Sequence, residues 1–326
     1  MDTVTHITMG VALGGLATLD PVVHQDPLTF QAVLAGTIIG SHAPDFDTLS
    51  KLKNNAVYIR NHRGITHSIP AIFVWGAAIS AVLYLIFPEV NYLHLFLWTL
   101  LAVMLHVFVD IFNAYGTQAA RPIHNKWSAL GFINTFDPFI FTILIIGIVF
   151  WILGANPGWT FSVAFFIIAM YFVKRYFDKK KIIALVHDDI DNVEQIVTSP
   201  TVKHHFWRVA ITTADYFYVA EYRNGEMKYI DKFVRKKLPD HPAMNKALTD
   251  ENMQAFLSFS PVYRWVIEER DDHTEVRLID LRYRSKEHYP FFAVVKLNND
   301  NEIITSYTGW IYSKNKLKKK LKPITN

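Results

Sequence analysis

The side chains best suited to chemistry in this sequence are histidines and aspartates within its first third. His106 and Asp110 are four positions apart, about one helical turn, so both project from the same face of a helix. Together they could hold one cation. A structural His–Asp pair at a helix end has the same spacing. Because ionisable groups are costly at the end of an apolar helix, the functional interpretation is favoured.

Two preceding loops contain further candidate ligands. Asp45 and Asp47 alternate with a single aromatic residue, so in extended conformation both carboxylates face the same way, as a hard or borderline cation requires. A solvated acidic turn would have the same sequence. The second loop offers two imidazoles and a guanidinium that could hold an oxyanion or phosphate. These residues are His62, His67 and Arg63.

The elements that must position these groups are apolar. The chain of 326 residues is 51% hydrophobic and 19% charged, below the roughly 25% charged residues of typical soluble domains, which predicts a membrane protein. Runs 69–87 and 93–109 approach the roughly 20 residues that span a bilayer. Four shorter runs bring the expected number of helices to between four and six. They are 7–19, 28–39, 139–153 and 159–173.

The charges of the loops favour six spans. Every basic residue lies in three alternate segments, and the loops between them contain none. Because basic residues favour the cytoplasmic side of the plasma (inner) membrane, we expect a multi-pass protein with both termini cytoplasmic. His6 then lies at the cytoplasmic end of the first helix, on the same membrane face as the other candidate ligands. The basic segments are 40–68, 110–138 and 174–326; the others are 20–27, 88–92 and 154–158.

The second half of the chain has a different character. Residues 1–173 carry six basic and eight acidic side chains, net −2, whereas residues 174–326 carry 27 and 21, net +6. Period-two alternation on both sides of Asn224-Gly225 predicts antiparallel strands joined by a tight hairpin turn. We therefore predict an α-helical integral membrane domain of about six helices over residues 1–175. A small antiparallel β-rich cytoplasmic domain should follow over residues 176–326.

The expected partners of the second half are membrane lipids. Its C-terminal segment 314–322 is rich in lysine, and a cytoplasmic polybasic segment tethered to a membrane binds anionic lipid headgroups. Its aromatic residues fit strand packing better than base stacking, so no nucleic acid is expected. The sequence does not predict an oligomeric state.

The chemistry open to the first half is that of a bound divalent metal. The chain has no cysteine, which leaves His, Asp and Glu as first ligands. Three to five such ligands with open positions can hold zinc, or alternatively manganese or iron, and the metal lowers the pKa of a bound water toward neutral. Arg63 could then stabilise developing negative charge.

In combination these motifs resemble those of the YdjM-type membrane-bound metal-dependent hydrolases, over about residues 1–125. Their order is also similar to the first half of the metal site in zinc-dependent phospholipase C and related single-strand nucleases. The soluble enzymes add a second downstream His with an acidic partner one turn later, which this sequence lacks, so one or two ions are expected. The motifs are Thr3-Val-Thr-His6, Gly40-x4-Asp45-x-Asp47, His62-Arg63-Gly64-x-Thr66-His67-Ser68, and His106-x3-Asp110 with Tyr115-Gly116.

The resemblance implies a division of roles among the candidates. One metal would be bound by His6, a second by Asp45 or Asp47 with two histidines, and Asp110 would bridge the ions. The other residues implied are the metal ligands His67 and His106, with His62 and Arg63 as catalytic residues near the substrate.

The function predicted is hydrolysis of a phosphoester in a lipid or lipid-linked substrate by a metal-activated water. The alternative is a non-enzymatic membrane protein, either an ion carrier or an anchor that recruits a partner through its cytoplasmic domain. A carrier should have its ligands near the bilayer midplane. Here the predicted ligands lie at one membrane face, which favours the enzyme.

Overall fold

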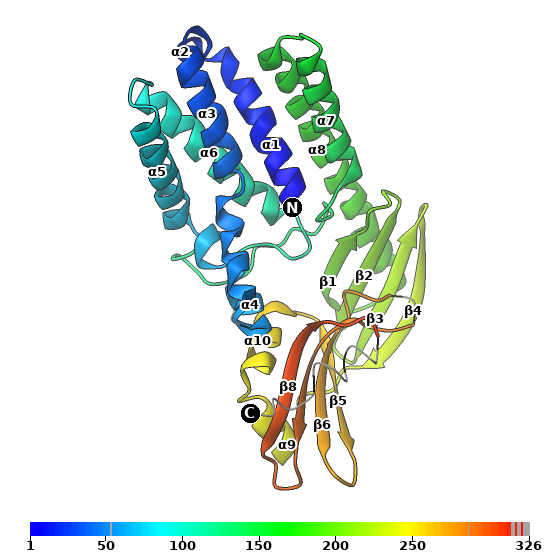
Figure 1. Ribbon diagram of the computed structural model, residues 1–326. Helices are drawn as coiled ribbons and strands as arrows, with labels where there is room; N and C mark the ends of the chain where they lie inside the picture. Colours follow the sequence, from blue (N-terminus) through cyan, green and yellow to red (C-terminus); the bar gives the residue numbers. More distant parts are fainter. Residues whose placement is uncertain (53, 286, 314–316, 318–320, 322–326) are drawn as a thin grey trace. The chain divides into compact units, whose positions relative to one another are not determined.

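A computed structural model describes residues 1–52, 54–285, 287–313, 317 and 321 (Figure 1). The chain forms two compact units. The first contains Met1–Asp47 and Arg63–Lys181, and the second contains Thr48–His62 and Ile182–Asn326. The segment predicted to bind lipid headgroups, 314–322, lies outside the described residues except for Leu317 and Leu321.

Polar caps define where the helices of the first unit begin. An Asp, Asn or Ser side chain accepts hydrogen bonds from the first free N–H groups of α1, α2, α3, α5, α6 and α7. Proline follows the cap in four of them, where its missing N–H costs nothing. The elements are α1 Thr3–Leu16, η1 Ala17–Leu19, α2 Pro21–Gln25, α3 Pro27–Gly40, η2 Ala43–Leu52, η3 Ile65–His67, α5 Ile69–Ile86, α6 Tyr92–Ile111, α7 Pro138–Ile152 and α8 Pro157–Asp189.

Three helices among the described residues are long and apolar enough to cross a membrane: α5, α6 and α8. The apolar helices Thr3–Leu19, Pro27–Gly40 and Pro138–Ile152 are shorter. Five of the six closely match an apolar run of the sequence, and α8 contains the run 159–173 but continues to Asp189. The helical N-terminal region is thereby confirmed with three candidate spans, and the crossing of all six helices stays a prediction.

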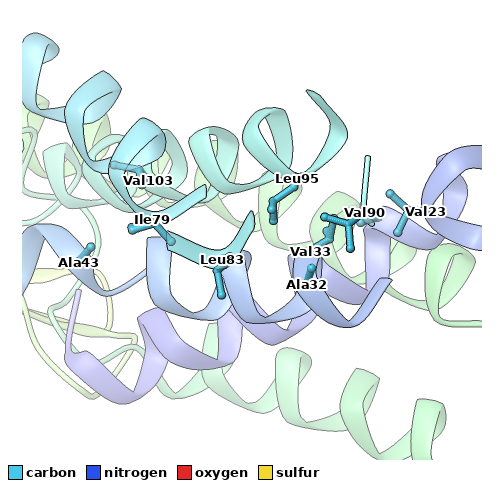
Figure 2. Packing of buried hydrophobic residues seen from close by; sticks show 10 residues of the cluster. Val23, Ala32, Val33, Ala43, Ile79, Leu83, Val90, Leu95 and Val103 are labelled. Atoms are coloured by element: carbon cyan, nitrogen blue, oxygen red, sulfur yellow. The ribbon is translucent and has the colours of Figure 1, made fainter. Parts of the chain in front are cut away.

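Helix α3 packs against α1, α5 and α6, and this packing brings the loop after α3 close to α6. Figure 2 shows the apolar contact, in which Val33, Leu83, Leu95 and Val103 are buried together. At Gly40 a Cβ atom would lie 3.0 Å from the Thr99 carbonyl oxygen, so the backbones approach as closely as glycine allows. The loop that begins at Ser41 is therefore fixed against α6.

The second unit contains two four-stranded antiparallel sheets, in the orders β1-β2-β3-β4 and β5-β6-β7-β8. Asn224 and Gly225, with φ of 52° and 100°, form the predicted tight turn between β3 and β4. The β-rich character of the C-terminal half is thus confirmed. The elements are α4 Asn55–Asn61, β1 Val193–Pro200, β2 Phe206–Thr213, β3 Tyr216–Arg223, β4 Glu226–Val234, α9 Pro242–Ala247, α10 Glu251–Phe259, β5 Tyr263–Glu269, β6 Thr274–Asp280, β7 Phe291–Leu297 and β8 Ile303–Trp310.

Candidate metal centre

Four ligand atoms from separate parts of the first unit converge. Asp45 Oδ1, His67 Nε2, His106 Nε2 and one Asp110 oxygen lie within 4.8 Å of one another, and all four residues are buried. The two Nε2 atoms are 3.2 Å apart. Asp45 Oδ1 lies 3.5 and 3.7 Å from them, and Asp110 Oδ2 lies 3.6 and 3.7 Å from them. In a tetrahedral zinc site with bonds of about 2.0–2.1 Å, adjacent ligand atoms are about 3.3 Å apart, so the cluster has the size of such a site.

The protons of both imidazoles can be assigned from their other hydrogen bonds. His106 Nδ1 lies 2.6 Å from the Ser41 carbonyl oxygen, which only accepts, so Nδ1 is the donor. The Thr66 hydroxyl donates to Asp47 Oδ2 at 2.8 Å, and its oxygen therefore accepts from His67 Nδ1 at 3.1 Å. In both rings the proton is on Nδ1 and the lone pair of Nε2 points into the cluster. Metal-binding histidines are oriented in this way.

The cluster consequently joins two carboxylate oxygens and two nitrogen lone pairs. Within the part of the chain that the structure describes, Asp45 Oδ1 and Asp110 Oδ2 are buried without a hydrogen bond, and Asp110 Oδ2 has an ion-pair contact with Arg63 Nη2 at 3.2 Å. Buried acceptors that face one another are strongly destabilising unless a cation lies between them. The residues present therefore fit a divalent metal ion with nitrogen and oxygen ligands.

Two short elements and one long helix supply the four ligands. His106 and Asp110 are one turn apart on α6, as their spacing predicts. Asp45 lies in the first turn of η2, which follows the close contact between α3 and α6. His67 ends η3, and Ser68 then caps α5 with a hydrogen bond to Ala71 N. The site thus joins three elements that are separate in the sequence.

Arg63 extends from a strained backbone into the same region. Its φ is 59°, unusual for a residue with a side chain. Its N–H donates to Asp47 Oδ2 and its carbonyl accepts from Gln118 N, at 2.8 and 2.9 Å, which holds this conformation. Its Nη2 lies 3.2 Å from Asp110 Oδ2 and donates to the Met1 carbonyl at 3.0 Å. Nε and Nη1 are buried without an acceptor among the described residues, which leaves donors for an anion.

His6 lies beside the four-atom cluster. Its ring stacks on His106 with centroids 3.7 Å apart, and its Nε2 is 3.4 Å from Asp110 Oδ1. The same carboxylate oxygen pairs with the Met1 amino group and accepts from Asn113 Nδ2 at 3.0 Å. The structure thus places His6 next to the cluster, and its role as a ligand stays a prediction.

The other two sequence candidates have different surroundings. Asp47 Oδ2 lies 3.9 Å from His67 Nδ1 and accepts hydrogen bonds from Thr66 and from the backbone of Arg63. It lies on the Nδ1 side of that ring, whereas the four converging atoms lie on the Nε2 side. His62 is the C-cap of α4 in the second unit, with its ring stacked on Tyr58 at 4.7 Å. Their predicted roles as metal ligand and catalytic residue are not tested by these contacts.

Burial and the neighbouring charges control ionisation at the two ligands that lie outside the long helices. Burial raises the pKa of the Asp45 carboxyl, but its close polar contacts with His106 and His67 and the positive charge of Arg63 outweigh burial, and the pKa ends below its usual range. Burial lowers the pKa of His67 to about 3 despite its contact with Asp45. Both groups are therefore in their metal-binding protonation states at neutral pH.

Sequence reasoning missed the residues that orient these ligands. Thr66, Ser41, Asn113 and Gln118 each contact a ligand or Arg63 through one hydrogen bond. Thr66 lies within a motif that the sequence singled out, so its position gave a signal. The Ser41 contact uses a backbone carbonyl, which no residue type reveals.

A helical region with apolar spans and a buried His/Asp cluster defines a membrane protein with a candidate metal site. The chain belongs to the YdjM inner membrane protein family, whose model matches residues 1–182. The family resemblance of the sequence motifs is thereby confirmed, and the more distant similarity to phospholipase C stays a prediction.

The second half of the chain matches two further family models. These are the YfhP middle domain, over residues 191–233, and the YfhP C-terminal alpha/beta plait domain, over residues 242–321. The chain is 56% identical over 323 residues, 99% of each protein, to a Bacillus subtilis (strain 168) protein named "Uncharacterized protein YfhP". No solved structure matches the chain.

Proposed function

We propose that this protein is a membrane-bound metal-dependent hydrolase that cleaves a phosphoester in a lipid or lipid-linked substrate. The observation that carries the proposal is the convergence of four buried ligand atoms, with the Nε2 lone pairs of both histidines directed into the cluster. Nitrogen and oxygen ligands at tetrahedral spacing favour zinc, with manganese or iron as alternatives. The four-atom cluster accounts for one ion, and His6 beside Asp110 Oδ1 would serve a second.

Each residue has a distinct part in this function. Asp45, His67, His106 and Asp110 hold the ion, and Arg63 binds the phosphate through its remaining donors. The bound ion supplies a Lewis acid and a water of lowered pKa. The guanidinium is held within 3.2 Å of a ligand carboxylate, so a phosphate bound to it would lie next to the ion.

Two features support a lipid substrate. The family and the candidate spans give the protein a membrane location. Apolar side chains also lie beside the ligands in the chain: Phe46, next to Asp45, is 44% exposed, and Ile65, two residues before His67, is 66% exposed. An exposed apolar surface beside a phosphate site suits a substrate with acyl or prenyl chains. The loop charges support six spans with both termini and the site cytoplasmic.

The first experiment measures bound metal. The full chain is purified in detergent, loaded with zinc, manganese or iron, desalted, and subjected to elemental analysis beside the His106→Ala/Asp110→Ala double variant. The matched control is the double variant His94→Ala/Asp20→Ala, which removes another His–Asp contact of α6. In the wild type, His94 Nδ1 and Asp20 Oδ2 are 2.5 Å apart. We expect a stoichiometric ion in the wild type and in the control, and none in the first variant. A metal-free wild type after loading would refute the metal site.

The second experiment tests hydrolysis. Phospholipids and prenyl phosphates in mixed micelles are incubated with the metal-loaded protein, and the released water-soluble phosphate or headgroup is measured. The expected result is metal-dependent release that Arg63→Gln reduces without loss of the ion. Bound metal with no release from any of these substrates would contradict the hydrolase and favour an ion carrier. The same bound metal with release unaffected by Arg63→Gln would contradict the assigned role of Arg63.

A further inference from the structure

The second unit contains a cleft of about 790 Å³ that the proposed hydrolase does not use. Its described walls come from β4, from the strands β5, β6 and β7, from the segment before β7, and from residues after β8. A volume of this size lies within the range of small-molecule and cofactor sites, about 300–1,000 Å³. The described lining residues of the cleft all belong to the second unit, whereas the four ligands of the candidate metal centre belong to the first.

Strand register explains which side chains reach this cleft. Arg264 on β5 is paired with Ile279 on β6, which in turn is paired with Phe292 on β7. Because side chains alternate between the two faces of a sheet, these residues share one face with Arg277. The neighbouring Phe291 is on the opposite face, where Phe256 of α10 stacks on it at 5.6 Å. The helix thus covers one face, and the other bears two arginines and apolar side chains.

On the sheet face that lines the cleft, the guanidinium of Arg264 has N–H donors available to a ligand. Its Cζ lies 4.7 Å from the centroid of the Phe233 ring across the cleft. Its Nε is buried without an acceptor, and it forms no ion pair within the described ranges 1–52, 54–285 and 287–313. A guanidinium stacked on an aromatic ring is oriented in advance and keeps its donor edge for a planar or tetrahedral anion.

The remaining charges leave this guanidinium uncompensated. Arg277 pairs with Glu275 and, at 3.7 Å, with Glu268, although its Nε is also buried without an acceptor among the described residues. The described acidic residues of the cleft are Asp231 and the exposed Glu287, and neither forms an ion pair with Arg264. Asp231 already accepts from Tyr289 Oη at 2.6 Å and from Arg284 Nε at 2.7 Å. Asp231 therefore does not neutralise Arg264, and an anion could enter.

The aromatic walls indicate what the anion should be attached to. Phe233 and Tyr289 lie together with centroids 6.0 Å apart, and Phe292 is also part of the lining. Because the Arg264 guanidinium already lies over Phe233, a flat ring would stack on the half-buried rings of Tyr289 or Phe292. Such stacking is favourable for any aromatic base.

We propose that this cleft binds a nucleotide-sized phosphate compound, with the phosphate on Arg264 and a planar ring against the aromatic walls. Arg277 Nε supplies an additional donor. The proposal does not depend on hydrolase activity in the first unit.

The test is isothermal titration of the full chain in detergent with ADP, GDP and UDP as probes, and with pyrophosphate and adenosine as the two halves of a ligand. We expect at least one nucleoside diphosphate to bind more tightly than pyrophosphate and more tightly than adenosine. Arg264→Gln should weaken this binding by about tenfold or more, since it removes a charge-assisted contact. The matched control is Arg223→Gln, because Arg223 is stacked on Phe206 at 4.6 Å in the same unit but is not part of the cleft lining.

The results separate this proposal from the hydrolase. The His106→Ala/Asp110→Ala variant should bind the nucleotide as the wild type does, whatever its metal content. Absence of binding by all three diphosphates at millimolar concentration would overturn the proposal. Equal losses in Arg264→Gln and Arg223→Gln would overturn the role of this cleft, and pyrophosphate binding as tightly as the nucleotides would overturn the planar-ring requirement.

Discussion

Replacement of Thr66 by valine should weaken metal binding although no ligand is removed. The Thr66 hydroxyl donates to Asp47 Oδ2 at 2.8 Å and accepts from His67 Nδ1 at 3.1 Å. Valine has nearly the same shape, so the change mainly removes the polar contact. His67 is fully buried. Its Nδ1–H therefore loses its hydroxyl acceptor, and the nearest carboxylate oxygen, Asp47 Oδ2, is 3.9 Å away.

The magnitude follows from the cost of losing that hydrogen bond. A buried polar group that loses its partner costs about 1–3 kcal/mol. At about 1.4 kcal/mol per factor of ten, this equals a loss of affinity of about 5- to 150-fold. Changes to groups that orient metal-bound histidines typically cost about 10- to 100-fold, in agreement. We expect Thr66→Val to reduce metal affinity by about 10- to 100-fold and to keep the same stoichiometry at saturation.

The assay is competition of the metal-loaded protein in detergent with a chelator of known affinity. Thr66→Ser keeps the hydroxyl and should retain most of the affinity. Thr99→Val is the matched control, because Thr99 is also fully buried and its hydroxyl has no hydrogen-bond partner among the described residues. Wild-type affinity in Thr66→Val, or an equal loss in Thr99→Val, would refute the assigned orientation of His67.

Three further outcomes follow from the structure. Burial lowers the pKa of His67 to about 3 in the folded chain. Between about pH 6.5 and 3, the unfolded chain therefore binds a proton at this residue that the folded chain does not bind. The unfolding temperature of the metal-free protein should consequently decrease as the pH falls from 7 to 5. His67→Gln should show a shallower pH dependence, and an identical one would contradict the reasoning. Gly40→Ala should cost about 1–3 kcal/mol in thermal unfolding, since its Cβ would meet the Thr99 carbonyl at 3.0 Å; unchanged stability would mean that α3 can shift. Asp280→Ala should destabilise the second unit by about 3–5 kcal/mol in denaturant unfolding, because buried Arg282 loses its ion pair; bound metal should not change.

Most of the first unit could be predicted from the sequence because helices in a membrane are specified locally. Apolar runs and their capping residues are continuous segments, and the six runs predicted here lie in α1, α3, α5, α6, α7 and α8, although α8 continues beyond its run to Asp189. The pairing of His106 with Asp110 was likewise a local property, since one helical turn fixes it. The hairpin at Asn224-Gly225 followed from residues that tolerate positive φ.

The sequence alone determined which residue types were available and that the first half is apolar and helical. Only the tertiary structure decided that Asp45 joins the four-atom cluster while Asp47 contacts Thr66 behind His67. Two aspartates separated by one residue have the same local pattern, and their roles differ because η2 is wound as a helix rather than extended. The proton positions on the histidines also depended on contacts between distant segments, such as His106 with the Ser41 carbonyl. Local pattern thus gave the candidate ligands, and packing between helices decided which of their atoms meet.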